Sequence, residues 1–275
     1  ALRQHEALHD GLTGLPNREL LRIRAERAIA HAGETGQHVG VMLLDLDHFK
    51  EVNDTLGHHV GDGLLREVAR RVTDALPAEV TVARLGGDEF AVLVPGADEM
   101  GTVGLLAERV ADRLRESVHA EGVRIGVQAS IGIAVYPDDA TSVQNLIKHA
   151  DIAMYRAKSA GGGHCFYSPE MGERLRRDLE LVQRFGQALH DGCLQLHYQP
   201  KVSLADGSLT GVEALLRWHD PDWGWVSPAD FLPVIEERGM MVRLGEWVLA
   251  EACRQLCAWR DAGLPLPPRV AINVS

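Results

Sequence analysis

The sequence feature that most constrains the fold is the run VGVMLLDLD, which covers residues 39–47. It is almost continuously apolar until two alternating acids, Asp45 and Asp47, at its end. Such a run predicts a central strand buried on both faces, because a strand with one face in water alternates apolar and polar residues. Acids at the C-terminal end of such a strand fall where α/β sheets usually bind ligands. A cap or a solvated strand end is the alternative, especially for Asp47.

Residues 84–90, RLGGDEF, predict a β-hairpin with an acidic shoulder. Its two glycines separate strand-like runs over residues 81–85 and 90–94. A Gly-Gly pair in this setting is typical of a two-residue turn, because the favoured hairpin turns need positive φ at the tip. A tip without side chains, followed by Asp88 and Glu89, lets a phosphate and a metal ion approach the backbone closely. For the motif alone, an ordinary solvated hairpin is an equal alternative.

The remaining N-terminal residues predict helices mixed with strands. Apolar spacing predicts helices over residues 18–32, 60–76, 98–118 and 142–160, and a long strand over residues 123–135. Asn17 is well placed to cap the first helix, and the glycines at 161–163 are a strong stop signal for the last. Roughly the first 167 residues therefore predict a complete α/β domain.

The C-terminal residues predict a second, incomplete domain. A charged helical stretch over residues 169–190 predicts a connecting helix. Strands over residues 194–200 and 209–218, a helical region over 228–263 and an apolar strand over 270–275 follow. Because the sequence stops inside a strand, we expect a truncated domain, and we divide the chain into residues 1–168, 169–190 and 191–275.

Composition excludes some classes of partner. A net charge of −11 argues against a general nucleic-acid coat or a basic membrane-surface protein, but not against a nucleotide, whose phosphates need only a few local cations and a metal ion. No apolar run approaches the roughly 20 residues that span a bilayer, and no signal peptide opens the sequence. We therefore expect no membrane insertion and a cytoplasmic location, although a longer parent protein could be membrane-tethered. The four cysteines lack disulfide or zinc spacing and predict buried thiols.

Four separated blocks resemble the GGDEF diguanylate cyclases. They are DGLTGLPNR at 10–18, DLDHFKEVNDTLGHHVGD at 45–62, RLGGDEF at 84–90 and ADIAMYRAK at 150–158. The resemblance implies a nucleotidyl-cyclase or polymerase-palm-like central sheet flanked by helices. It also implies an enzyme of bacterial second-messenger signalling that condenses two GTP into cyclic di-GMP and releases pyrophosphate. Each protomer of a homodimer would hold one GTP, and an upstream sensor domain would lie in the parent protein.

The resemblance implies a role for each residue of the site. Mg²⁺ (or Mn²⁺) would be bound by Asp45, Asp88 and the backbone carbonyl of Leu46, and the catalytic acids would be Asp88 and Glu89. Guanine would be bound by Asn53 and Asp62. The phosphates would be bound by the backbone of Phe49 and by the side chains of Lys50 and Lys158. Hard oxygen ligands suit Mg²⁺. A carboxylate can accept from both N–H groups on the Watson–Crick edge of guanine, a pattern that adenine lacks.

Two positions depart from the family's pattern. Gly162 stands where the family often has a phosphate-binding arginine, and losing one charge-assisted contact could cost roughly 1.5–3 kcal/mol of GTP binding. Residues 77–80, PAEV, replace the R-x-x-D of the family's product-inhibition site, so we expect no feedback binding there.

The C-terminal segment resembles the start of an EAL phosphodiesterase domain. The matching residues are Gln199, Glu213, Arg217 and Asn273, with Glu213 and Asn273 as implied metal ligands and the other two in contact with the dinucleotide. Such a domain is a TIM-type barrel of about 250 residues, of which this chain has the opening third. We therefore expect a truncated barrel-like segment without phosphodiesterase activity. The alternative function is a catalytically weak GTP-binding domain that regulates an EAL phosphodiesterase in the parent protein; a scaffold-only interaction domain is a third alternative.

Overall fold

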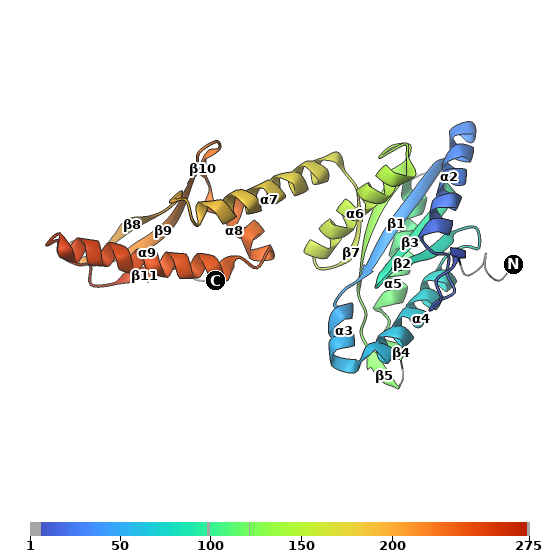
Figure 1. The fold of residues 1–275 in the computed structure, drawn as a ribbon, viewed down its shortest axis with the longest axis horizontal. Helices are drawn as coiled ribbons and strands as arrows, with labels where there is room; N and C mark the ends of the chain where they lie inside the picture. Colours follow the sequence, from blue (N-terminus) through green and yellow to red (C-terminus); the bar gives the residue numbers. More distant parts are fainter. Residues whose placement is uncertain (1–6, 98–99, 121, 274–275) are drawn as a thin grey trace. The chain divides into compact units, whose positions relative to one another are not determined.

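A computed structural model describes residues 7–97, 100–120 and 122–273. The chain divides into two compact units, residues 1–173 and 174–275, and each is described by itself (Figure 1). The first unit holds a five-stranded sheet between helices, and the second holds a smaller open sheet.

The sheet of the first unit is built around β1 (His38–Leu46). Its strand order is β2-β3-β1-β6-β7, with β2 at Thr81–Gly86, β3 at Glu89–Ala97, β6 at Ala129–Tyr136 and β7 at Gly163–Phe166. β1 pairs antiparallel with both β3 and β6, and β6 pairs parallel with β7. The prediction of a central strand over residues 39–47 is confirmed, as is the hairpin formed by β2 and β3. The two-residue turn predicted at Gly86-Gly87 is wrong by one residue: Gly86 pairs with Glu89 after a register shift in β2, so the turn consists of Gly87 and Asp88.

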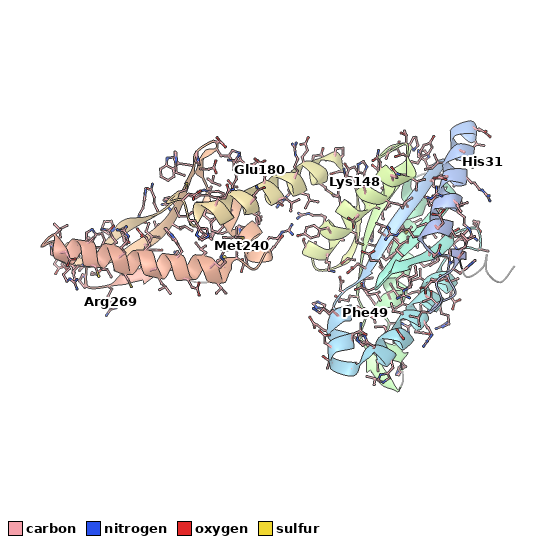
Figure 2. All side chains as sticks on the ribbon, viewed as in Figure 1. His31, Phe49, Lys148, Glu180, Met240 and Arg269 are labelled. Atoms are coloured by element: carbon pink, nitrogen blue, oxygen red, sulfur yellow. The ribbon has the colours of Figure 1, made fainter. Side chains whose placement is uncertain are left out.

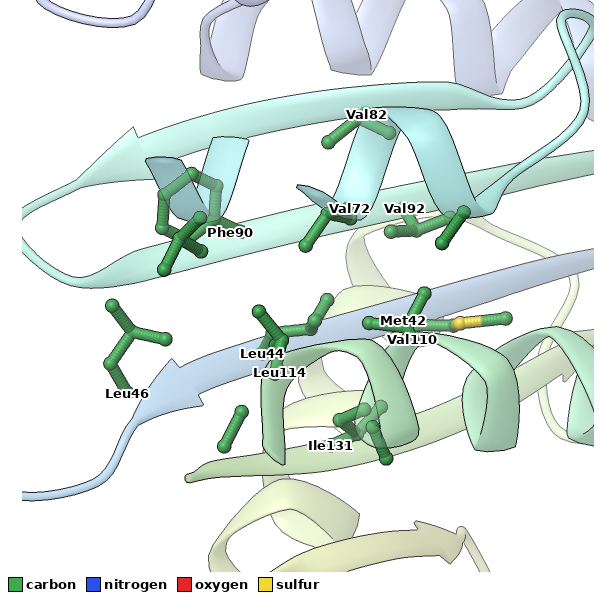
Figure 3. Close-up of a cluster of buried hydrophobic side chains, with 14 of the residues drawn as sticks. Met42, Leu44, Leu46, Val72, Val82, Phe90, Val92, Val110, Leu114 and Ile131 are labelled. Carbon is green, nitrogen blue, oxygen red and sulfur yellow. The ribbon is translucent and has the colours of Figure 1, made fainter. Parts of the chain in front are cut away.

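Alternate residues of β1 support two separate cores. Met42, Leu44 and Leu46 pack with α4 (His58–Ala75) and α5 (Met100–Arg115), as Figure 3 shows for part of this core. Val39, Val41 and Leu43 pack on the other face with α2 (Arg18–Thr35) and α6 (Val143–Ser159). Since successive side chains of a strand point to opposite faces, Asp45 continues the α2/α6 face. The α/β class predicted from the apolar run is confirmed.

Local signals fix where the helices begin. The Asn17 side chain accepts from the backbone N–H groups of Glu19 and Leu20 at 3.0 and 3.1 Å, which confirms the predicted cap of α2. Ser142 caps α6 in the same way. A short helix, α3 (Phe49–Leu56), lies between β1 and α4.

The prediction of one long strand over residues 123–135 is wrong. The segment forms two strands with different partners: β5 (Val123–Ile125) pairs with β4 (Val118–Ala120), whereas β6 joins the main sheet. Apolar alternation continues through Val127. Alternation reports which face a side chain takes but not which strand supplies its hydrogen bonds, so it could not reveal the break.

The second unit is an open sheet covered by helices. Its elements are α7 (Pro169–Ala188, which begins in the first unit), β8 (Leu194–Val202), β9 (Leu209–Asp220), β10 (Gly224–Val226), α8 (Pro228–Glu237), α9 (Met241–Asp261) and β11 (Val270–Ile272). β9 pairs antiparallel with β8 and β10 and parallel with β11. The buried rings of Trp218, Phe185 and Phe231 pack together. Across the residues that the structure describes, these strands do not close into a barrel. The end of the strand predicted to reach residue 275 lies outside the described residues.

Within the described ranges, no helix is long and apolar enough to cross a membrane. α9, with 21 residues, buries Leu244, Val248 and Ala252 on one side. The prediction of buried thiols is wrong for Cys253 and Cys257, which are exposed because they lie away from that side of the helix.

Candidate functional site

The end of β1 brings three acids together. Asp45 lies directly across from Glu89 in the register of β1 and β3, and Asp88 comes one residue earlier, in the hairpin turn. The Asp45 side chain is 14% exposed and accepts a hydrogen bond from Lys158 Nζ at 2.5 Å. Lys158 lies in the last turn of α6, so the sheet and a helix more than a hundred residues later meet at one point.

The surroundings disfavour ionisation of two acids in this cluster, Asp88 and Glu89. Burial, together with the charge of Asp45, raises the pKa of Asp88. Burial also raises the pKa of Glu89, against the pull of the Arg18 guanidinium 3.9 Å away. The hydrogen bond to Asp45 raises the pKa of Lys158, which stays a cation. Added positive charge would therefore stabilise the ionised cluster.

The donor set of the cluster fits a divalent cation. Asp45, Asp88 and the carbonyl of Leu46 offer the hard oxygen atoms that Mg²⁺ prefers. Burial and the charge of Asp45 raise the pKa of Asp88, and the Lys158 ammonium group is held on Asp45; both indicate that this position attracts cations. Over the described part of the chain, no group of three or more His, Cys, Asp and Glu side chains is arranged for a metal ion.

The hairpin is clamped to the N-terminal turn by Arg84. Its side chain is 11% exposed, and the guanidinium group donates to both carboxylate oxygens of Asp10 at 3.0 and 3.1 Å and to the Gly87 carbonyl at 2.7 and 3.2 Å. Asp10 also accepts from the backbone and hydroxyl of Thr13. Burial alone would raise the pKa of Asp10, but the hydrogen bonds from Thr13 and Arg84 outweigh it and the net direction is down. The clamp fixes the turn that carries Asp88.

The absence of a side chain at Gly61 leaves room for Asn53 between α3 and α4. A Cβ atom on Gly61 would lie 2.0 Å from Asn53 Oδ1 and 3.3 Å from the Phe49 ring. The Asn53 side chain therefore lies over the backbone of Gly61, directly before Asp62. Figure 2 shows Phe49 at the start of α3. Lys50 follows it and is exposed.

A cavity of about 390 Å³ adjoins the acids on the α2/α6 face of the sheet. Leu43, Ile147 and Met154 contribute apolar lining, and Glu89 joins the cavity to the cluster at the end of β1. Its other charged lining residues are Arg18, Lys148 (labelled on α6 in Figure 2) and Asp151. Burial and the charge of Asp45 raise the pKa of Asp151.

The second unit holds a smaller polar cluster on β9. Glu213 lies across from Gln199 of β8, and its carboxylate accepts from Asn273 Nδ2 at 3.1 Å. Lys201 Nζ lies 2.8 Å from the other oxygen. Hydrogen bonds from Lys201 and Asn273 lower the pKa of Glu213. Arg217 lies four residues along β9, on the same face as Glu213, and donates to the Leu216 carbonyl.

Comparison with protein families decides the membership of the chain. Residues 7–164, more than half of the sequence, match the family described as "Diguanylate cyclase, GGDEF domain", and residues 182–275 match the EAL domain. The chain belongs to the GGDEF family. The predicted GGDEF–EAL arrangement is confirmed, with the EAL domain present in part.

Solved GGDEF domains share the fold of the first unit. The GGDEF domain of TpbB (YfiN) from Pseudomonas aeruginosa is 36% identical, with a TM-score of 0.60, and the match covers 61% of this chain and 99% of that one. A sensory box/GGDEF family protein from Caulobacter crescentus is 43% identical, with a TM-score of 0.54, over 56% of this chain and 99% of that one.

Curated relatives continue the match into the EAL segment. MucR of Pseudomonas aeruginosa, a bifunctional diguanylate cyclase/cyclic di-GMP phosphodiesterase, is 46% identical over 98% of this chain and 39% of its own length. PdeR of Escherichia coli, a cyclic di-GMP phosphodiesterase, is 40% identical over 97% of this chain and 40% of its own length. The chain thus spans about two fifths of the length of these relatives.

The GGDEF domain thus gathers the acids and the Lys158 ammonium at one strand end, with Asn53 over Gly61, the residue before Asp62 in α4. Sequence reasoning assigned no role to Arg84 and Asp10, whose ion pair holds the hairpin turn, or to Arg18 and Asp151, whose charges act on Glu89. For Arg84 and Asp10 a signal was present, because each belongs to a GGDEF block, but a contact across 74 residues cannot be read from spacing.

Proposed function

We propose that the GGDEF domain of this chain is an active diguanylate cyclase, which condenses two GTP into cyclic di-GMP with release of pyrophosphate. The observation that carries the proposal is the meeting of Asp45, Asp88 and Lys158 at the end of β1. Membership of the GGDEF family supports it.

The acids serve metal binding and proton transfer. Asp45, Asp88 and the Leu46 carbonyl would hold Mg²⁺ (or Mn²⁺), which when bound neutralises charge at the α-phosphate. The ribose 3′-oxygen of one GTP attacks the α-phosphorus of the other, and the bond to pyrophosphate breaks. Asp88 accepts the 3′-hydroxyl proton as the general base. Glu89 supports the metal ion or the partner nucleotide.

The remaining residues hold the nucleotide. Asn53 and Asp62 bind the Watson–Crick edge of guanine, and the backbone of Phe49 with Lys50 and Lys158 binds the phosphates. The GGDEF domain has one such set of residues, so a reaction of two GTP needs a second protomer.

The context of the whole protein is also a proposal. We assign boundaries at residues 168 and 190, an upstream sensor domain in a longer parent, and a cytoplasmic location. In the EAL fragment, Gln199, Glu213, Arg217 and Asn273 would begin a cyclic di-GMP site. We assign phosphodiesterase chemistry to the longer parent and not to this chain, because residues 182–275 match only part of the EAL domain.

Turnover on GTP tests the cyclase proposal directly. The purified chain is incubated with GTP and Mg²⁺ and the nucleotides are separated by chromatography. We expect cyclic di-GMP and pyrophosphate to appear with GTP and not with ATP, and to require the divalent ion. GTP binding without product would contradict the cyclase proposal.

One observation favours the alternative, a weak GTP-binding domain that regulates an EAL phosphodiesterase. Gly162, which replaces the family's arginine, has φ of 97°, a conformation that side-chain-bearing residues rarely adopt. The loop is thus built without a phosphate-binding side chain at that position. GTP-dependent phosphodiesterase activity of the longer parent, with no turnover of GTP, would favour this function.

Gly61→Ala should weaken GTP binding with little loss of stability. The new Cβ would displace the Asn53 side chain, whose oxygen lies 2.0 Å from that position, and so remove one guanine contact. We expect the Kd for GTP, measured by calorimetry, to rise about tenfold, the loss of roughly one hydrogen bond. Gly101→Ala is the matched control, because nothing lies within 4 Å of its added Cβ. Equal affinities of the two variants would contradict the guanine role of Asn53.

A further inference from the structure

We infer that Asp47 and Ser130 are positioning residues, which hold the turn between β1 and α3 so that the first N–H groups of α3 face the nucleotide phosphates. The inference rests on the proposed function and concerns the same site. Neither residue touches the nucleotide in this assignment. Each acts through the backbone of His48 and Phe49.

Two hydrogen bonds tie Asp47 to the start of β6 and to Gln128 directly before it. Ser130 Oγ donates to Asp47 Oδ1 at 2.9 Å, and the backbone N–H of Asp47 donates to the Gln128 carbonyl at 2.9 Å. Ser130 is fully buried, and its register partner in β1 is Asp45. The carboxylate of Asp47 thus serves the turn, in contrast to that of Asp45, which contacts Lys158.

The residue that follows Asp47 has a strained backbone. His48 has φ of 61°, and among the described residues it is the only non-glycine with positive φ. Such a conformation persists where the surrounding structure enforces it, and it is frequent at functional sites. The two hydrogen bonds of Asp47, immediately before His48, provide that enforcement.

The strained turn sets the direction of α3. The helix begins at Phe49, directly after His48, and the His48 side chain makes no capping hydrogen bond. The backbone N–H groups of Glu51 and Val52 donate to the His48 carbonyl. The first N–H groups of a helix have no intrahelical partner and suit an anion, so those of Phe49 and Lys50 are the ones directed outward.

A third segment lies against the other oxygen of Asp47. A Cβ atom on Gly162 would lie 3.3 Å from Asp47 Oδ2 and 3.9 Å from the Ala129 carbonyl. The β1–α3 turn, the start of β6 and the glycine loop before β7 therefore meet at one carboxylate. A simple strand-end cap would need none of these partners from distant segments.

Loss of the hydrogen bond should affect phosphate binding alone. In Ser130→Ala, His48 can relax to negative φ and the first turn of α3 can move away from the phosphates, while the Asn53 side chain, one turn later in α3, remains over Gly61. We expect KM for GTP to rise about tenfold, equivalent to about 1.4 kcal/mol, with kcat within about twofold of wild type. Inhibition by pyrophosphate should weaken by the same factor, whereas binding of guanosine should not change.

The experiment uses the full chain with four variants. Asp47→Ala should reproduce Ser130→Ala, the double variant should add nothing further because the two residues act as one unit, and Asp47→Asn, which keeps an acceptor oxygen, should restore KM to within about threefold of wild type. Amide hydrogen exchange over residues 47–52 should accelerate in the two alanine variants and not in Asp47→Asn. This readout needs no turnover, so it tests the inference even if the wild-type chain binds GTP without forming product.

Two controls separate positioning from general loss of stability. Val103→Ala removes two methyl groups of a fully buried side chain beside Gly40, which lies five residues before Asp45 on β1. Ser208→Ala removes a Ser-to-Asp hydrogen bond of 2.8 Å in an exposed turn of the second unit. Neither should change KM. Equal effects of Ser130→Ala and Val103→Ala, equal weakening of pyrophosphate and guanosine, or unchanged exchange over residues 47–52 would overturn the inference.

Discussion

Asp88→Asn should abolish formation of cyclic di-GMP while making the folded domain more stable at neutral pH. The variant loses both a charged metal ligand and the proposed base for the 3′-hydroxyl. We expect turnover to fall about 10³-fold or more, a loss of about 4 kcal/mol of transition-state stabilisation. Chromatographic detection of cyclic di-GMP measures it, and turnover within tenfold of wild type would contradict the role of Asp88.

The gain in stability follows from the direction of the pKa shift. Burial and the charge of Asp45 raise the pKa of Asp88, so ionisation of this group costs folding free energy. That cost is absent below the pKa of an unfolded aspartate, grows as pH rises through the folded pKa, and is fully present at neutral pH. Asparagine removes it. The stability difference, measured by denaturant unfolding, should therefore be greatest at pH 7 and shrink towards pH 4.

A matched carboxylate tests whether the effect belongs to the site. Asp112→Asn removes a carboxylate of α5 that is 60% exposed and paired with Arg115. An exposed pair of this kind contributes about 0–1 kcal/mol, so we expect unchanged turnover and little change in stability at any pH.

Gly132→Ala should destabilise the GGDEF domain more than any other single-methyl change proposed here. The added Cβ would lie 1.9 Å from the Ala150 carbonyl oxygen and 2.1 Å from the Met154 backbone nitrogen. These are main-chain atoms of α6, which cannot rotate away, so the whole helix must shift from β6. We expect a loss of about 3 kcal/mol or more in the free energy of unfolding, at the upper end of overpacking effects.

The displacement of α6 should also reduce turnover, because α6 carries Lys158. Gly126→Ala is the control, since nothing lies within 4 Å of its added Cβ and its φ is not positive. It should change stability by no more than about 0.5 kcal/mol. Similar denaturation midpoints for the two variants would mean that α6 and β6 are not held at this spacing.

Sequence patterns predicted the parts of the fold that depend on local chemistry. The apolar run fixed β1 as a central strand, the glycine pair fixed the hairpin, and Asn17 fixed the start of α2. The break after Ile125 was not predictable, because the residues on both sides keep the same apolar alternation and differ only in their hydrogen-bonded partners.

The site was predictable only in part for the same reason. Asp45, Asp88 and Lys158 came from motifs of the GGDEF family, and the structure places Lys158 on Asp45. The contact between Ser130 and Asp47 joins residues 83 positions apart, and neither residue type signals it. Likewise, the cavity on the α2/α6 face depends on how helices and sheet pack rather than on any segment alone.

Because β1 contributes to two separate cores, the Asp45 carboxylate also disfavours a shifted register of the strand. A slip of one residue along β3 and β6 would exchange the two faces of β1 and turn Asp45 towards the wholly apolar core around Leu44 and Leu46. Burying an unpaired carboxylate there would cost several kcal/mol. Asp45, on which catalysis is proposed to depend, thus raises the free energy of a sheet with a shifted register. Selection for turnover and selection for correct strand pairing therefore act on one side chain.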